Sequence, residues 1–103
     1  MFEIGGKEYE LKFNLKRVKL IEQRLGEGGV PKALIGSEGM LSIGDCEAFF
    51  AFGLKEAGSD VFVNPTRGAE LFEQYCEETS YTSAIMRIYE QAQLDLGFMF
   101  RAN

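Results

Sequence analysis

The chain has 103 residues, of which 46% are hydrophobic and 26% charged, a composition typical of one soluble globular domain. It contains no histidine, which excludes a histidine base, a histidine-dependent triad and most zinc sites. The formal net charge of −5 argues against a nucleic-acid-binding protein.

Residues 2–13 carry the pattern of a β-hairpin. Gly5 and Gly6 can take the positive φ angles that a two-residue hairpin turn requires. The resulting register places the apolar side chains on one face, which consists of Phe2, Ile4, Tyr9, Leu11 and Phe13. Because a two-stranded ribbon is only marginally stable alone, this face must pack on other elements.

Asn14 predicts the start of a helix over about residues 15–25, which the glycines at 26, 28 and 29 end. Its expected apolar stripe consists of Leu15, Val18 and Ile21. Its outer face is basic and carries Lys16, Arg17, Lys19 and Arg24. The glycine cluster lacks the Gly-Lys-Ser/Thr ending of a phosphate-binding loop, so it is interpreted as a flexible connection.

After a short helical turn at 30–35 and a loop, Ser42 and Asp45 resemble a capping box and predict a helix over about residues 43–57. Gly58 is expected to cap its C-terminus. This segment is apolar on nearly every side, which is typical of a central helix covered by its neighbours. A ligand pocket between its phenylalanines is the weaker interpretation.

Two more helices follow. The pair Asn64-Pro65 predicts a helix over about residues 65–79, and Ser80 a last helix over about 81–98. The inward side chains are expected to be Leu71, Phe72, Tyr75 and Cys76, then Tyr81, Ile85, Ile88, Ala92 and Leu96. Residues 61–63 fit a third strand or an extended linker, and the linker is favoured. The fold class is therefore α+β, mainly α: one domain, residues 1–103, with an N-terminal β-hairpin packed on about four helices.

The sequence predicts no enzymatic activity, cofactor or metal site. It lacks a nucleophile elbow, a dinucleotide fingerprint and a calcium-binding loop. Glu70, Glu73 and Glu77 form an acidic ridge that is expected to be solvated rather than catalytic. Cys46 and Cys76 lack metal-ligand spacing and are expected to be buried, reduced thiols. No signal peptide or long apolar run is present, which predicts a cytoplasmic protein that does not contact a membrane.

The end of the chain is unusually apolar for a terminal helix, which has few elements left to cover it. The sequence therefore predicts a protein-binding surface that consists of Met86, Tyr89, Phe98, Met99 and Phe100. An equally weighted alternative is that this end folds back beneath the hairpin.

Charge is unevenly distributed along the chain. Residues 1–35 hold seven Lys and Arg against five Asp and Glu, which gives +2, whereas residues 36–103 hold four against eleven, which gives −7. Copies of the chain could attract each other through these parts, although solvated helix faces are the simpler interpretation. The residues that would meet are Lys16, Arg17 and Arg24 of one copy and Glu70, Glu73 and Glu77 of the next.

The hairpin Phe2–Phe13, which leads directly into a helix rich in Leu, Val and Ile, resembles the start of the tail assembly chaperones of long-tailed phages and prophages. The later order is similar too, since a short apolar segment ends in Gly53–Ala57 and two Glu-rich helices follow.

The resemblance implies a non-enzymatic protein of the host cytoplasm. Such chaperones bind the tape-measure protein, keep it soluble while the tail tube polymerises around it, and leave the finished tail. Family members also tend to self-associate. Two alternatives stay open: a small structural head–tail or tail accessory protein of the virion, or an acidic protein-binding module.

Overall fold

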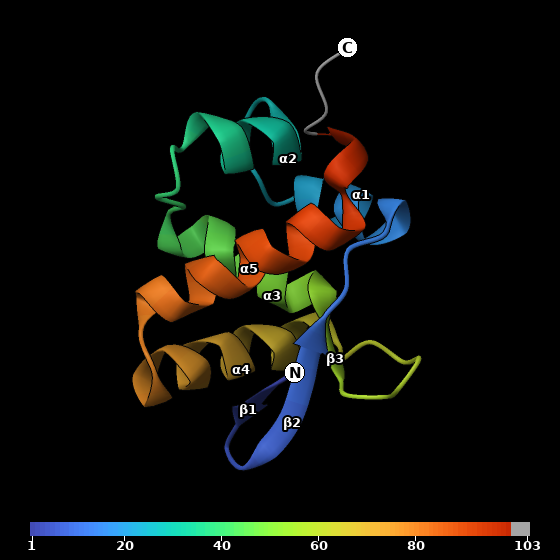
Figure 1. Cartoon of the computed structure of the whole chain (residues 1–103), viewed down its shortest axis with the longest axis vertical. Coiled ribbons are helices and arrows are strands. Elements are labelled where there is room, and N and C mark those ends of the chain that lie inside the picture. The colour runs from blue at the N-terminus through green and yellow to red at the C-terminus, as the bar shows by residue number, and fades with distance from the viewer. Residues whose placement is uncertain (100–103) are drawn as a thin grey trace.

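The computed structural model describes residues 1–99 and confirms the predicted α+β, mainly α, fold (Figure 1). A three-stranded antiparallel sheet is formed by β1 (Phe2–Ile4), β2 (Lys7–Leu11) and β3 (Leu54–Glu56). The helices are α1 (Leu15–Glu22), α2 (Gly29–Pro31), α3 (Ile43–Gly53), α4 (Pro65–Glu78) and α5 (Tyr81–Asp95). A π-helical segment, η1 (Lys32–Gly36), continues α2, and a 3-10 turn, η2 (Gly97–Met99), follows α5.

The predicted hairpin has the expected register, with Phe2 opposite Tyr9 and Ile4 opposite Lys7. Gly5 and Gly6 have φ angles of 61° and 82°, as the two-residue turn requires. All the apolar side chains of its inner face are buried. The strands of the hairpin contact α4 and α5, so the marginal ribbon is stabilised by the core. Figure 1 shows the hairpin beside α4.

The predicted helix over 43–57 is too long. It ends at Gly53, and the next three residues form β3, which pairs with β2 through Leu11–Leu54 and Tyr9–Glu56. A side chain at Gly53 would collide with the Phe13 ring, since an added Cβ would lie 2.5 Å from it. The helix ends there and the next residues pair with β2, whose open edge accepts another strand.

The segment after β3 also differs from expectation. Gly58 has a φ angle of 80° and turns the chain after the strand instead of capping a helix. The favoured linker over 61–63 is correct except for one isolated bridge, in which Phe62 pairs with Lys55.

Two other helix ends differ from prediction. The first helix stops at Glu22 rather than near residue 25, and its last turn is closed by bonds from Arg24 N to Ile21 O and from Leu25 N to Glu22 O. Leu15 is 59% exposed, so its predicted place in the apolar stripe is wrong. The last helix ends at Asp95, short of the predicted 98.

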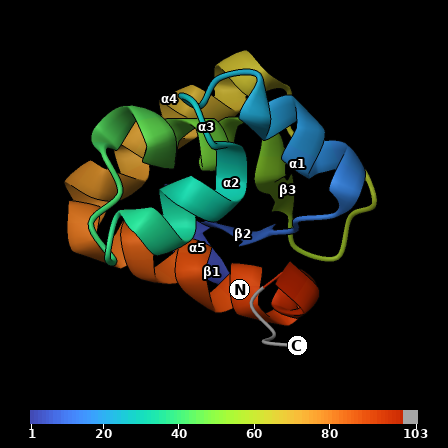
Figure 2. The same ribbon diagram turned by 90° about the horizontal axis from the view of Figure 1, so that it is seen from above.

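The centre of the core is α3, with α4 and α5 packed beside it (Figure 1). Phe50 is fully buried, and its ring contacts those of Phe2, Phe72 and Tyr75 at centroid distances of 6.1, 5.3 and 5.8 Å. Gly68 lets α4 approach the backbone of α3 closely, since an added Cβ would lie 2.9 Å from the Cα and O atoms of Ala51. Figure 2, seen from above, shows α1 and α5 apart, with β2 between them.

Asp95 joins the end of α5 to the junction between β2 and α1. Its carboxylate accepts hydrogen bonds from Phe13 N at 2.8 Å, Gln91 Nε2 at 2.9 Å and Lys12 Nζ at 2.9 Å. Burial alone would raise the pKa of Asp95, but these three bonds together outweigh it and hold the pKa below its ordinary value.

This arrangement predicts a pH-dependent contribution to stability. Because the folded-state pKa is lowered, the contribution is complete above the unfolded pKa and is lost as the pH falls through the folded one. The substitution Asp95→Asn should cost about 1–2 kcal/mol at pH 7, since charged hydrogen bonds are lost. In urea unfolding at pH 7, 5 and 3, the gap between wild type and variant should shrink with falling pH. A gap that stays constant would contradict this prediction, and Asp60→Asn at an exposed position is the control.

Candidate functional site

The C-terminal helix presents several of the residues predicted to bind a protein. Met86 is 55% exposed on α5, and Phe98 is 49% exposed on the turn that follows it. Leu94 is 79% exposed, more than Met86 or Phe98, although it is not among the contact residues that the sequence predicted. Leu96 between them is buried, so this end of the chain is partly folded onto the core and partly open. The Met99 side chain and Phe100 lie outside the described residues.

Tyr89 differs from the other predicted contact residues because it is half-buried and hydrogen-bonded within the chain. Its hydroxyl donates to the carbonyl oxygen of Leu34 at 2.5 Å and lies 3.0 Å from Ser37 Oγ. It therefore fixes η1 against α5. Tyr89 also lines a cavity of about 240 Å³, together with Leu34, Ile35 and Gln93.

Ile35 adds an apolar side chain to this region that the sequence did not single out. It is 57% exposed and borders the same cavity as Tyr89. Apolar side chains are therefore exposed on two neighbouring elements, α5 with Met86 and Leu94 and η1 with Ile35.

The basic residues predicted for self-association have different environments. The guanidinium of Arg17 lies 3.8 Å from the centre of the Phe62 ring, and that of Arg24 lies 4.9 Å from the Phe52 ring. Both arginines are thereby held against their own chain by cation–π contacts. Lys16 and Lys19 are exposed on α1.

The acidic ridge is exposed on α4, as predicted. Glu70 pairs with Arg67 at 3.4 Å, whereas Glu73 and Glu77 have no ion pair within residues 1–99. These two glutamates border a groove of about 380 Å³ between the start of α3, the second half of α4 and the start of α5. We call it the α3–α4 groove; its lining consists of Ile43, Phe72, Glu73, Cys76, Glu77 and Tyr81.

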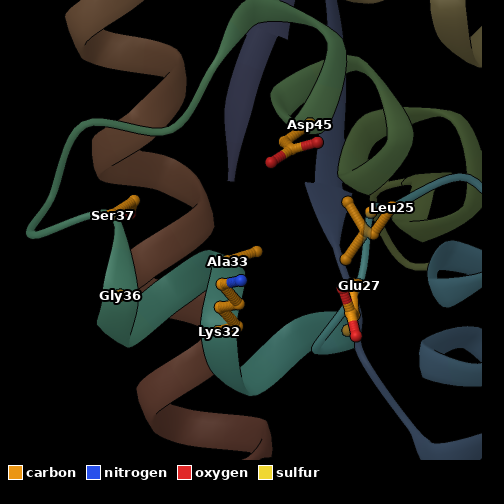
Figure 3. A pocket seen from close by; sticks show the side chains of 9 residues that line it. Leu25, Glu27, Lys32, Ala33, Gly36, Ser37 and Asp45 are labelled. Carbon is orange, nitrogen blue, oxygen red and sulfur yellow. The ribbon is translucent and has the colours of Figure 1, made fainter.

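A second hollow lies between the loop after α1, η1 and the start of α3 (Figure 3). Figure 3 shows Asp45 on one side of it and Lys32 and Ala33 on the other, with Leu25 and Glu27 at the edge. Its volume is about 240 Å³. One amine and two carboxylates can attract ions, but this set contains no activated nucleophile.

The two cysteines are free thiols. Cys46 is completely buried, and burial chiefly raises its pKa to about 12, so it is protonated at neutral pH. Cys76 is only half-buried, in contrast to the prediction for both, although burial also raises its pKa. No three Cys, Asp or Glu side chains of the described part gather in a metal-binding arrangement.

None of the helices within residues 1–99 is long and apolar enough to cross a membrane. No protein-family model, curated protein or solved structure matches this chain.

Proposed function

We propose that this chain is a non-enzymatic tail assembly chaperone of a long-tailed phage or prophage, acting in the host cytoplasm. In this role it binds apolar segments of the tape-measure protein and keeps that long chain soluble until the tail tube encloses it. The hairpin-and-helix start of the sequence, with its resemblance to such chaperones, supports the proposal.

The observation that carries the proposal is the exposure of large apolar side chains on and beside α5. Met86, Leu94 and Phe98 are exposed on this terminal segment, and Ile35 is exposed on η1 beside Tyr89. Three of them follow one another along the same terminal segment, and exposed apolar side chains along one segment fit a surface that binds a protein. Methionine adapts to varied apolar partners, which suits a chaperone that contacts a long chain at many points.

Self-association belongs to the same proposal. Copies would be oriented by ion pairs between the basic face of α1, where Lys16 is the most available of the three predicted residues, and the acidic ridge of α4. Exposed ion pairs contribute only about 0–1 kcal/mol each, so they would set orientation more than affinity. Weak contacts repeated along a long partner still give a strong hold through multivalency.

Co-expression with the tape-measure protein tests the proposal. The tape-measure protein should be soluble when the chain is present and should precipitate when it is absent. The chain should then be missing from purified phage particles, because a chaperone leaves the finished tail. Its presence in particles at a fixed stoichiometry would instead support the structural alternative.

A further inference from the structure

The α3–α4 groove combines an apolar floor with an acidic edge. Phe72 closes it from below, with 2% of its surface exposed, and Ile43 stands at its border with 64% exposed. Cys76 and Tyr81 are half-buried along its length. An isoleucine this exposed beside a hollow loses contact with water if an apolar side chain enters the groove.

The charges at the groove are all of one sign. Glu73 and Glu77 are one helical turn apart on α4, where like charges repel each other. None of the six lining residues is basic, and neither glutamate is ion-paired in the part of the chain that the structure describes. Burial raises the pKa of the Tyr81 phenol, and the negative charge of Asp45 raises it further. The groove therefore favours a cationic occupant.

We propose that the α3–α4 groove binds an amphipathic helix of another protein, which inserts an apolar side chain beside Ile43 and pairs two Lys or Arg residues with Glu73 and Glu77. The two carboxylates follow one face of α4 with a spacing of four residues. Basic residues four apart on a helix laid along α4 have the same spacing and meet both of them. The mode is that of a helix bound in a groove, with apolar anchors and a charged rim.

A second copy of this chain is a poorer occupant. The basic helix α1 has its apolar residues Val18 and Ile21 buried in its own core, and its arginine is held on the Phe62 ring. Only Leu15 is left as an exposed apolar side chain on α1, which does not make an amphipathic stripe. The groove lies apart from Met86, Leu94 and Phe98, so the proposal does not depend on binding of the tape-measure protein there. It does share Glu73 and Glu77 with the acidic ridge proposed for self-association, so a bound helix and a second copy would compete for these two carboxylates.

The test uses a synthetic helical peptide of about 18 residues, long enough to form a stable helix on binding. The peptide carries a leucine stripe flanked by lysines four residues apart, and a control peptide carries glutamate at every lysine. The full chain is titrated with each peptide in a calorimeter. The lysine peptide should bind and the glutamate peptide should not.

Two charge variants locate the site. The double variant Glu73→Gln and Glu77→Gln should weaken binding of the lysine peptide about fivefold, since each exposed pair contributes modestly. The control variant Glu3→Gln and Glu90→Gln removes the same charge from exposed positions outside the groove and should leave binding unchanged. The variant Ile43→Ser, at an exposed position, should weaken binding without unfolding the chain.

Cys76 supplies a direct readout of groove occupancy. Its alkylation by iodoacetamide, followed by mass spectrometry, should slow several-fold at saturating lysine peptide. Cys46 serves as an internal reference because it is fully buried and should react only if the chain unfolds.

Three results would overturn the proposal. The first is an unchanged Cys76 rate at saturating peptide, and the second is equal loss of binding in the groove and control charge variants. The third is a dimer of the free chain that Ile43→Ser dissociates, because it would assign the groove to a second copy. Sedimentation with and without peptide decides that point.

Discussion

The substitution Phe50→Ala is expected to destabilise the fold by about 4 kcal/mol, because it removes a fully buried ring and leaves a cavity. Phe50 belongs to α3 and lies where this helix meets the hairpin and α4. Its ring contacts Phe2 of the hairpin and both Phe72 and Tyr75 of α4. Loss of the ring therefore loosens the sheet and the helices together rather than one element alone.

Urea unfolding followed by circular dichroism measures this effect. Phe98→Ala is the matched control, since it removes the same ring from a position that is 49% exposed, and it should change stability by no more than about 0.5 kcal/mol. Equal costs for the two substitutions would show that Phe50 is not central to the core.

The second large effect is expected for Gly68→Val. This glycine lets α4 approach α3 so closely that even a Cβ would lie 2.9 Å from the Cα and O atoms of Ala51 and 3.0 Å from Phe50 O. Backbone atoms cannot rotate away as a side chain can, so the two helices must separate. We expect a loss of about 3 kcal/mol, at the upper end of the usual cost of overpacking.

Gly44→Ala is the control for Gly68→Val, because Gly44 is also helical and, apart from its chain neighbours and its own helix backbone, no atom lies within 4 Å of an added Cβ. It should stabilise the chain by about 0.5 kcal/mol through helix propensity. Thermal unfolding of both variants gives the comparison. A Gly68→Val protein that melts at the wild-type temperature would contradict the close packing of α3 on α4.

The features that the sequence predicted correctly depend on local chemistry. Each of Asn14, Ser42, Asn64 and Ser80 caps a helix by accepting a hydrogen bond from the backbone N–H three residues later. The hairpin likewise follows from a two-glycine turn and alternating residues. Such signals act within a few residues of the chain, so their outcome needs no knowledge of tertiary contacts.

The third strand could not be predicted in this way. Leu54, Lys55 and Glu56 continue the helical pattern of the preceding residues, and their state is decided by pairing with β2, more than 40 residues earlier in the chain. The ion pair of Lys55 with Glu10, at 2.5 Å, adds a contact across the same two strands.

Exposure at the candidate surfaces also depends on non-local packing. Tyr89 was predicted as a free contact residue, but η1 covers its hydroxyl, and the covering residues Leu34 and Ser37 precede it by more than 50 positions. Ile35 and Leu94, by contrast, are exposed because no element of the described part covers them, which local sequence does not reveal either. The acidic ridge was predicted from helix periodicity, whereas the groove beside it needs three helices to meet.

The central proposal is that the exposed apolar side chains of α5 and η2 hold the tape-measure protein in solution. The most direct measurement is the soluble fraction of co-expressed tape-measure protein with the wild-type chain and with a variant that carries serine at positions 86, 94 and 98. A control variant carries serine in place of Leu15, Met40 and Val61, which are exposed on other elements. We predict that wild type and control keep the tape-measure protein soluble and that the α5 variant lets it precipitate. Equal solubility with the α5 variant, or precipitation even with the wild-type chain, would contradict the account.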